Sequence, residues 1–302
     1  MMRAGNELMK MLREDMELSQ EQLGEHLHMS QRTISRVETG KRNLGIWEYM
    51  ALMQMAGTPT EDLSPLFLDS GELKDYNAYN ELRKLLRDRK YAEVREMLPD
   101  FEKNLASKQT FILQFITFAR IISDEEIPPE QAIEKLYEAL SMSIKNFDHE
   151  RIAKYRYTYF EILIITGIGM KLDAVGKVDC AIALCKALIE SRGNALATEE
   201  DKAALYPALM YNLSVSLGKA GKYAEALSYC EDAHGISIKY SNFRLVPKII
   251  YYMAYYNYML GEEERVYRTL YARAYHAAYA LGDRKTAEII KEEAKKIGLE
   301  DL

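Results

Sequence analysis

The sequence predicts an all-α protein with a small N-terminal head and a longer repetitive body. Its 302 residues include only 7 Pro and 16 Gly, the residue types that most often interrupt helices. No alternation of apolar and polar residues is flanked by hairpin turns, so strands are not expected. From about residue 74 onward, apolar residues recur at helical spacing and the pattern repeats along the chain. A chain of this length is expected to form about two domains.

The composition excludes several classes of protein. The net charge of −6 argues against binding nucleic acid over the whole surface. The N-terminus lacks the apolar core of a signal peptide, and the longest apolar stretch, near residues 162–170, is too short to span a bilayer. We therefore expect a cytoplasmic protein that does not contact a membrane.

The three cysteines form no CxxC motif. We expect Cys180 and Cys185 to be small buried apolar residues, with redox sensing by this pair as the alternative.

The head begins with a helix over residues 4–16, followed by two short helices within residues 18–43. Ser19 and Gln22 have the spacing of a capping box, which places the start of the first short helix. Ser30 is the expected cap of the second short helix, and Gly40 ends it.

The second short helix has one apolar face and one polar, basic face. Ile34 and Val37 are expected to point inward, whereas Gln31, Arg32 and Arg36 point outward. Between residues 30 and 43 there are four basic side chains and one acidic side chain. Arg and Gln can make paired hydrogen bonds to base edges, and Lys and Arg bind phosphates. This pattern favours a DNA-binding helix-turn-helix.

Residues 18–43 resemble the helix-turn-helix of phage-repressor-like (XRE-type) regulators. The resemblance implies that Gln20 meets a phosphate, that bases are read by Gln31, Arg32 and Arg36 with Thr33 nearby, and that the DNA backbone is contacted by Lys41, Arg42 and Asn43. It also implies a pair between Arg13 and Glu38.

The segment departs from this family at two positions. His28 stands where Gly is usual and Gly24 stands where Ala is usual. Two alternatives stay open for the segment: an ordinary helical hairpin with a solvated polar face, and a helix-turn-helix that no longer binds DNA.

The rest of the head supplies two more predicted helices, for five in all. Residues 46–56 carry Trp47, the single Trp of the chain, and residues 61–68 form a last short helix after the stop at residues 57–60. We therefore predict a DNA-binding domain over residues 1–68 and a linker over residues 69–75.

The body, residues 76–302, repeats at intervals of 38, 49, 45 and 40 residues. The clearest unit, residues 209–227, closely resembles a tetratricopeptide repeat, with a helix, a Gly turn and a Tyr-x-x-Ala helix. Echoes of the Tyr position fall at residues 91, 129, 178, 223 and 263. The resemblance implies about five repeats plus a capping helix at residues 284–297. Such repeats stack into a right-handed superhelical solenoid with a concave face.

Tyrosines and asparagines mark the expected ligand-binding helices. Of 22 Tyr, 14 lie between Tyr206 and Tyr279. An Asn on a first helix, such as Asn212 or Asn257, can pair with the N–H and C=O of a bound backbone. Core packing between repeats is the alternative for every one of these residues. From the helix phase, the candidate ligand contacts are Arg156, Tyr159, Asn212, Tyr252, Tyr256 and Asn257.

The head and body together resemble the peptide-pheromone-sensing regulators of Gram-positive bacteria, the group that includes Rgg, PlcR and PrgX. The resemblance implies a homodimer that contacts itself through the repeats, a short signalling peptide in the repeat groove and a palindromic DNA operator. Two alternatives from other classes are a protein-binding scaffold and an antitoxin-like repressor that responds to a protein partner.

No enzyme is expected. The five His have no metal-ligand spacing, and no phosphate-binding glycine loop or nucleophile motif is visible. His26 and His28, two residues apart, are not expected to share a helix face. We expect no metal and no cofactor.

Overall fold

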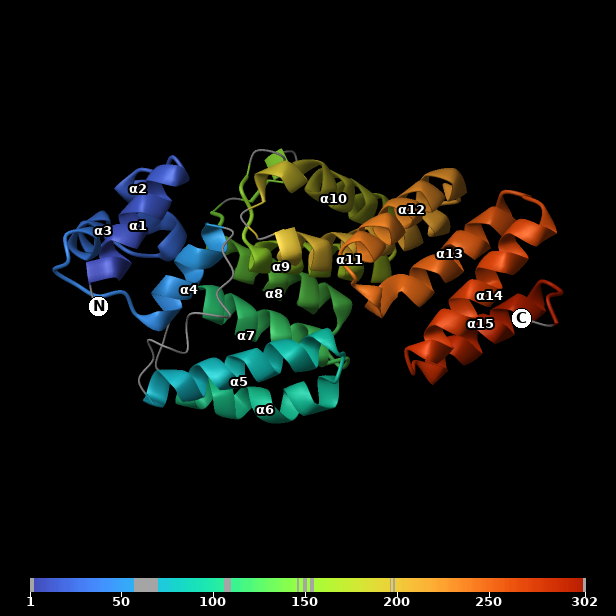
Figure 1. Cartoon of the computed structure of the whole chain (residues 1–302), viewed down its shortest axis with the longest axis horizontal. Coiled ribbons are helices and arrows are strands. Elements are labelled where there is room, and N and C mark those ends of the chain that lie inside the picture. Colours follow the sequence, from blue (N-terminus) through green and yellow to red (C-terminus); the bar gives the residue numbers. More distant parts are fainter. Residues whose placement is uncertain are drawn as a thin grey trace. The chain divides into compact units, whose positions relative to one another are not determined.

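Every element of the described chain is a helix (Figure 1). The structure is a computed structural model, and it describes residues 3–56, 70–105, 110–145, 147–148, 151–152, 155–195, 197 and 199–300. The predicted all-α class is confirmed. Within these ranges no helix is long and apolar enough to cross a membrane.

Four helices of the head surround a small apolar core. They are α1 (Arg3–Asp15), α2 (Gln20–Leu27), α3 (Gln31–Glu38) and α4 (Ile46–Met55). The core is formed by Met9, Leu23, Leu27, Ile34, Val37, Leu52 and Met55. The fifth predicted helix, at residues 61–68, lies outside the described residues.

Side-chain caps fix where α2 and α3 begin. The Ser19 hydroxyl accepts from the backbone N–H of Gln22 (3.1 Å), and the Gln22 side chain accepts from the backbone N–H of Ser19 (2.8 Å), so both halves of the capping box are present. The Ser30 hydroxyl caps α3 by accepting from the backbone N–H of Thr33. These caps satisfy donors that a helix cannot satisfy internally.

The turn between α2 and α3 explains the two unusual residues of this segment. His28 ends α2 in the left-handed region, with φ 52° and ψ 40°. The next backbone N–H, that of Met29, donates to the carbonyl of Gly24 at 2.8 Å. A Cβ on Gly24 would lie 2.5 Å from the carbonyl oxygen of Met29, which is too close for any side chain. Gly24 is therefore required by this turn rather than only tolerated.

The remaining helices pair as the repeat register predicts. The second helix of each predicted repeat begins where the sequence places it, at residues 91, 129, 178 and 223. In the fifth repeat the second helix begins at Glu264, one residue after the predicted position. The pairs are α5 (Ser70–Arg87) with α6 (Tyr91–Asn104), α7 (Thr110–Ser123) with α8 (Pro129–Ser141), α11 (Glu199–Lys219) with α12 (Tyr223–Lys239), and α13 (Val246–Met259) with α14 (Glu264–Ala280). Between the second and third of these pairs the chain forms α9 (Tyr159–Ala174) and α10 (Val178–Glu190). Helix α15 (Arg284–Lys296) follows as the predicted capping helix.

The chain divides into two compact units at a place that the sequence did not indicate. Unit 1 comprises residues 1–171 and 193–198, and unit 2 comprises residues 172–192 and 199–302. Helix α5 begins at Ser70, within the residues 69–75 that the sequence analysis predicts as a linker.

Unit 1 joins the head to the first repeat helices through one apolar cluster. In this cluster Ile46, Trp47 and Met50 of α4 are buried together with Tyr79 of α5 and Phe115 of α7. Because α4 packs against α5 and α7, the head and the first repeat helices belong to the same compact unit.

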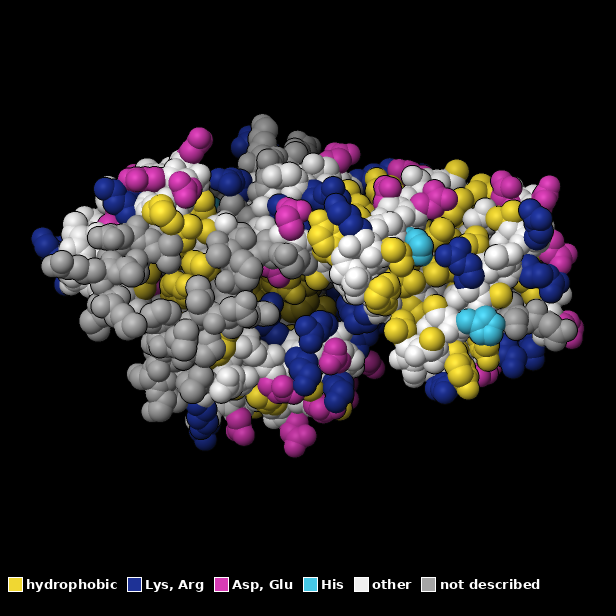
Figure 2. All heavy atoms as spheres, viewed as in Figure 1, with side chains coloured by type: hydrophobic (Ala, Val, Ile, Leu, Met, Phe, Trp, Pro, Cys, Tyr) yellow, Lys and Arg dark blue, Asp and Glu magenta, His cyan; other side chains and the backbone are white. Residues whose placement is uncertain are grey.

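Unit 2 has its own core beneath a surface that is partly apolar. Val246, Ile250 and Tyr271 are buried within the cluster between α13, α14 and α15. Figure 2 shows apolar side chains over much of the visible face of α13 and α14.

The cysteines differ from one another in exposure. Cys185 and Cys230 are buried, and burial raises the pKa of each thiol to about 12. Cys180 is exposed on α10, so the expectation that it is buried was wrong. Its position on α10, five residues before Cys185, points the two side chains in different directions.

Candidate nucleic-acid interface and ligand pocket

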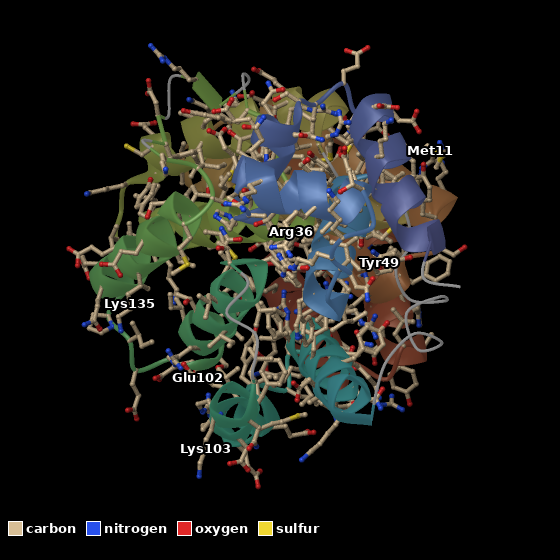
Figure 3. The ribbon with its side chains drawn as sticks, turned by 90° about the vertical axis from the view of Figure 1, so that its left-hand side faces the viewer. Met11, Arg36, Tyr49, Glu102, Lys103 and Lys135 are labelled. Carbon is tan, nitrogen blue, oxygen red and sulfur yellow. The ribbon has the colours of Figure 1, made fainter. Side chains whose placement is uncertain are left out.

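Helix α3 presents the polar face that the sequence predicts. Ile34 and Val37 are fully buried in the head core, whereas Gln31, Arg32 and Arg36 are exposed. Figure 3 looks onto the end of unit 1 that carries the head and shows Arg36 on α3, apart from Met11 on α1. The three exposed side chains can reach a partner that docks along α3.

Thr33 is less available than its neighbours. It is half-buried, and its hydroxyl lies 2.8 Å from the hydroxyl of Ser30 while its backbone N–H donates to the same oxygen. Thr33 therefore helps to cap α3.

Glu38, at the end of α3, ties α1 and the start of α2 to α3. The Arg13 Nε donates to Glu38 Oε1 at 2.6 Å, and the Gln20 Nε2 donates to Glu38 Oε2 at 2.8 Å. The Glu38 side chain is 4% exposed. Its burial raises the pKa of the carboxyl, but the hydrogen bonds from Arg13 and Gln20 outweigh that effect and hold the pKa below its ordinary value.

These contacts confirm the Arg13–Glu38 pair and refine the expectation for Gln20. One N–H of the Gln20 amide is used inside the head. A phosphate contact by Gln20 would use the second N–H of the same amide group.

The loop after α3 holds the three residues expected at a DNA backbone. Lys41 and Asn43 are exposed. The Arg42 Nη2 donates to Glu48 Oε1 at 2.6 Å, and Glu48 also accepts from the backbone N–H of Gly45 at 2.9 Å. Arg42 is therefore oriented by α4, although its side chain is still 40% exposed.

Asn212 and Tyr252 are half-buried candidate ligand contacts in unit 2. Asn212 lies on α11 and Tyr252 on α13. The ring of Tyr252 packs edge-on against Tyr211, with centroids 5.6 Å apart. Both residues keep the partial exposure that a ligand contact needs.

Tyr256 is a core residue, contrary to the expectation that it contacts a ligand. It is fully buried, and its hydroxyl donates to the carbonyl of Ser214 at 2.6 Å. Its ring occupies the space beside Gly218, where an added Cβ would lie 2.7 Å from the ring. Tyr256 therefore packs α13 against α11.

Asn257 is half-buried on α13, and its amide is used within its own helix. The Asn257 Nδ2 donates to the carbonyl of Met253 at 2.8 Å. This bond uses one N–H of the amide and leaves its second N–H and its oxygen as the groups that could meet a ligand.

Arg156 and Tyr159 belong to unit 1. Arg156 is exposed, and its Nη1 donates to the carbonyl of Met16 at 3.4 Å, so it links the repeat part of unit 1 to the head. Lys154, which neighbours Arg156 in the sequence, lies outside the described residues.

Tyr159 borders a pocket that the sequence did not reveal. The pocket has a volume of about 330 Å³ and is lined by Tyr76, Asn80, Arg83, Lys84, Arg87 and Tyr159. The Arg83 guanidinium lies 5.4 Å from the centre of the Tyr159 ring and 5.6 Å from that of Tyr79. Five of the lining residues form one stripe of α5, with spacings of three, four and seven residues. This stripe was the signal that could have identified them.

A second, smaller cavity lies where the head meets the repeats of unit 1. It holds about 30 Å³ and is lined by His26 and His28 of the head and by Glu161 and Gln114 of the repeats, among others. The two His share a cavity because His28 has left the helix in the left-handed turn. Burial lowers the pKa of His28. The described residues contain no group of three or more His, Cys, Asp or Glu side chains that could hold a metal ion.

Comparisons with known proteins agree with this architecture. The helix-turn-helix domain family matches residues 7–66. The crystal structure of Bacillus thuringiensis PlcR in complex with the peptide PapR7 and DNA has a TM-score of 0.65 at 18% identity, covering 94% of this chain and 98% of that chain. The chain shares the fold of PlcR.

Other solved structures extend this likeness. ComR from S. thermophilus in complex with DNA and its signalling peptide has a TM-score of 0.56 at 18% identity, covering 97% of this chain and 99% of that chain. The SHP pheromone receptor Rgg2 of Streptococcus dysgalactiae has a TM-score of 0.50 at 17% identity, covering 96% and 98%. Among curated proteins, none matches the sequence. The resemblance to peptide-pheromone-sensing regulators is thus confirmed at the level of the PlcR fold.

Proposed function

We propose that this protein is a sequence-specific DNA-binding transcription regulator, and that a short signalling peptide bound by its repeat helices controls its DNA binding. The observation that carries the DNA part is α3, whose exposed Gln31, Arg32 and Arg36 stand opposite a buried apolar face. This helix is capped, and it is anchored to α1 and α2 through Glu38. Such rigid support suits side chains that read base edges.

The relatives support the same kind of function. PlcR and ComR were each crystallised with DNA and a peptide, and Rgg2 is described as a pheromone receptor. By analogy the active form here is a cytoplasmic homodimer on a palindromic operator. Its half-sites should lie about one helical turn, or a multiple of it, apart.

The DNA part is tested by titrating the purified full-length chain into fluorescently labelled DNA from its own upstream region. Arg36→Ala should weaken specific binding by about 1–3 kcal/mol if Arg36 contacts a base, and scrambled DNA should bind the variant and the parent alike. Lys103→Ala is the control, because Lys103 is an exposed basic residue of α6, outside the head. Equal affinities of the parent and Arg36→Ala for specific DNA would refute the assignment of α3.

The peptide part predicts a different pattern for Asn212. Asn212→Ala should remove the effect of an activating or repressing peptide and leave DNA binding without peptide unchanged, because Asn212 lies far along the chain from the head. Synthetic peptides covering short secreted reading frames near the gene would be added to the same DNA titration. A full peptide response in the variant would leave Asn212 with a packing role only.

A further inference from the structure

A buried carboxylate is bonded to the loop that is expected to meet the DNA backbone. Glu48, in the first turn of α4, is 6% exposed. Its Oε1 accepts from Arg42 Nη2 at 2.6 Å, and its Oε2 accepts from the backbone N–H of Gly45 at 2.9 Å. A negative charge near such a loop repels phosphates, so by itself it is unfavourable for DNA binding. The bond to Arg42 offers a reason for its presence.

Arg42 is held by two helices of the head. Its backbone N–H and that of Lys41 donate to the carbonyl of Arg36, in the last turn of α3, at 3.1 and 2.8 Å. Gly40 lets the chain turn there, with φ 71° in the left-handed region. Through its side chain Arg42 is bonded to Glu48 of α4. The backbone of Arg42 is therefore fixed to the helix that carries Arg36, and its guanidinium is fixed to the next helix.

Glu48 is a rigid support for that guanidinium. The two residues before it, Ile46 and Trp47, are buried in the apolar cluster shared with α5 and α7. Its bond to Gly45, the residue that precedes α4, is one half of a capping box. A guanidinium held by such a carboxylate has less freedom left to lose when it binds a phosphate. The Arg42 side chain is still 40% exposed and has five N–H donors, so it can bind a phosphate without releasing Glu48.

We propose that Glu48 is a positioning residue for DNA binding, and that its orientation of Arg42 toward a phosphate outweighs the repulsion between its own charge and the DNA; this rests on the proposed function. The repulsion is weakened by the paired guanidinium and by salt. The charge-assisted bond that orients Arg42 is stronger than a bond between neutral groups. Removing the charge of Glu48 therefore weakens DNA binding, whereas removing another acidic charge from the head strengthens it.

The sign of the effect is measured with the full-length chain on two labelled duplexes, its own upstream DNA and a scrambled sequence, across a salt series. Glu48→Gln keeps an oxygen for the Gly45 N–H, because Gln also serves in capping boxes, and loses the charge. Affinity for both duplexes should fall roughly 2- to 5-fold. The dependence of log affinity on log salt should become shallower by up to about 1. Glu25→Gln, at an exposed position of α2, is the matched control and should raise both affinities by up to roughly 2-fold.

A double-mutant cycle shows whether Glu48 acts through Arg42. In the Arg42→Ala background, Glu48→Gln should cause no further loss and should instead raise affinity slightly, as Glu25→Gln does in the parent. A role of Glu48 in helix packing alone would give the same loss in both backgrounds. Circular dichroism checks that each variant is folded. If Glu48→Gln is not, Arg42→Lys decides, because it keeps the charge but not the planar group that carboxylate and phosphate share, and it should lose affinity by a similar factor.

The proposal is overturned if Glu48→Gln binds DNA as tightly as the parent or more tightly, if its loss is the same in the Arg42→Ala background, or if Arg42→Lys, where it has to decide, keeps the parent's affinity. The parent's preference for its upstream DNA over the scrambled duplex tests the proposed function separately. Phosphate contacts act on both duplexes, so the Glu48 comparison can be read on the scrambled one even without such a preference. A parent that binds neither duplex overturns both.

Discussion

Each of the two units of this molecule contains a cluster of packed aromatic rings, and the two clusters differ in what lies beside them. In unit 1 the rings of Trp47, Tyr79 and Phe160 pack between α4, α5 and α9, and Arg83 lies against two tyrosines at the edge of a pocket. In unit 2 the tyrosines of α13 pack on one another and on α11: Tyr252 contacts Tyr211, Tyr255 and Tyr256. An abundance of tyrosine therefore does not locate a binding site. What distinguishes the region in unit 1 is the cavity beside its rings, because unit 2 also places a guanidinium over a ring, that of Arg284 over Tyr279.

The largest effect is expected from removing the Tyr256 ring, which is buried between α11 and α13 of unit 2. Tyr256→Ala should lower the free energy of unfolding by about 3–5 kcal/mol, because it leaves a cavity between α11 and α13. Tyr256→Phe keeps the ring and loses only the bond to the Ser214 carbonyl, which should cost about 1 kcal/mol. Urea unfolding followed by circular dichroism measures both. If Tyr256→Ala were as stable as Tyr256→Phe, Tyr256 would not be a core residue.

Alkaline pH should distinguish the tyrosines that unit 2 buries. Burial raises the pKa of Tyr256, Tyr251 and Tyr271 above the ordinary value of 10.0. The folded state keeps these protons while the unfolded state loses them, so stability is present below pH 10 and falls as the pH rises above it. Tyrosinate absorbance near 295 nm should therefore increase together with loss of helix. Full ionisation of these residues in a helical protein would contradict their burial.

Adding a methyl group at two helical glycines, Gly218 and Gly167, tests the packing on a smaller scale, because the space around the two positions differs. A Cβ on Gly218 would lie 2.7 Å from the Tyr256 ring, whereas a Cβ on Gly167 of α9 would make ordinary contacts of 3.4–3.7 Å with Leu136, Phe118 and Ile122. Gly218→Ala should destabilise by about 1–3 kcal/mol through overpacking. Gly167→Ala should stabilise by up to about 1 kcal/mol, because Ala favours the helix. Thermal melts of the two variants should shift in opposite directions.

Local signals in the sequence were sufficient for much of the fold. The capping residues Ser19 and Ser30 placed α2 and α3, and the Gly-Lys-Tyr turn placed α12, because each of these signals acts within a few residues. The exposed residues of α3 followed from the burial of Ile34 and Val37 at helical spacing.

Features that depend on distant residues were not predictable in the same way. Tyr256 was assigned to a ligand surface, but the absence of a side chain at Gly218, on another helix, creates the space in which its ring is buried. The pocket depends on Arg83 and Tyr159, which lie far apart in the chain. Trp47 packs into the repeats through contacts with Tyr79 and Phe111. These partners lie more than thirty residues away in the sequence, so the turn residues at 69–75 could not show that the head shares an apolar cluster with the repeats.

The turn between α2 and α3 has a consequence for how this head could have evolved. Ala, which resembling heads carry at the position of Gly24, would bring its Cβ to 2.5 Å from the Met29 carbonyl oxygen. Gly24→Ala alone is therefore deleterious here, although Ala is the better helix former. The cost of that substitution depends on the path that the chain takes through His28 and Met29. His28 adopts the left-handed conformation that Gly, the usual residue at its position, takes more readily. His28→Gly would therefore keep this turn, and the close approach of the Met29 carbonyl would still require Gly at position 24.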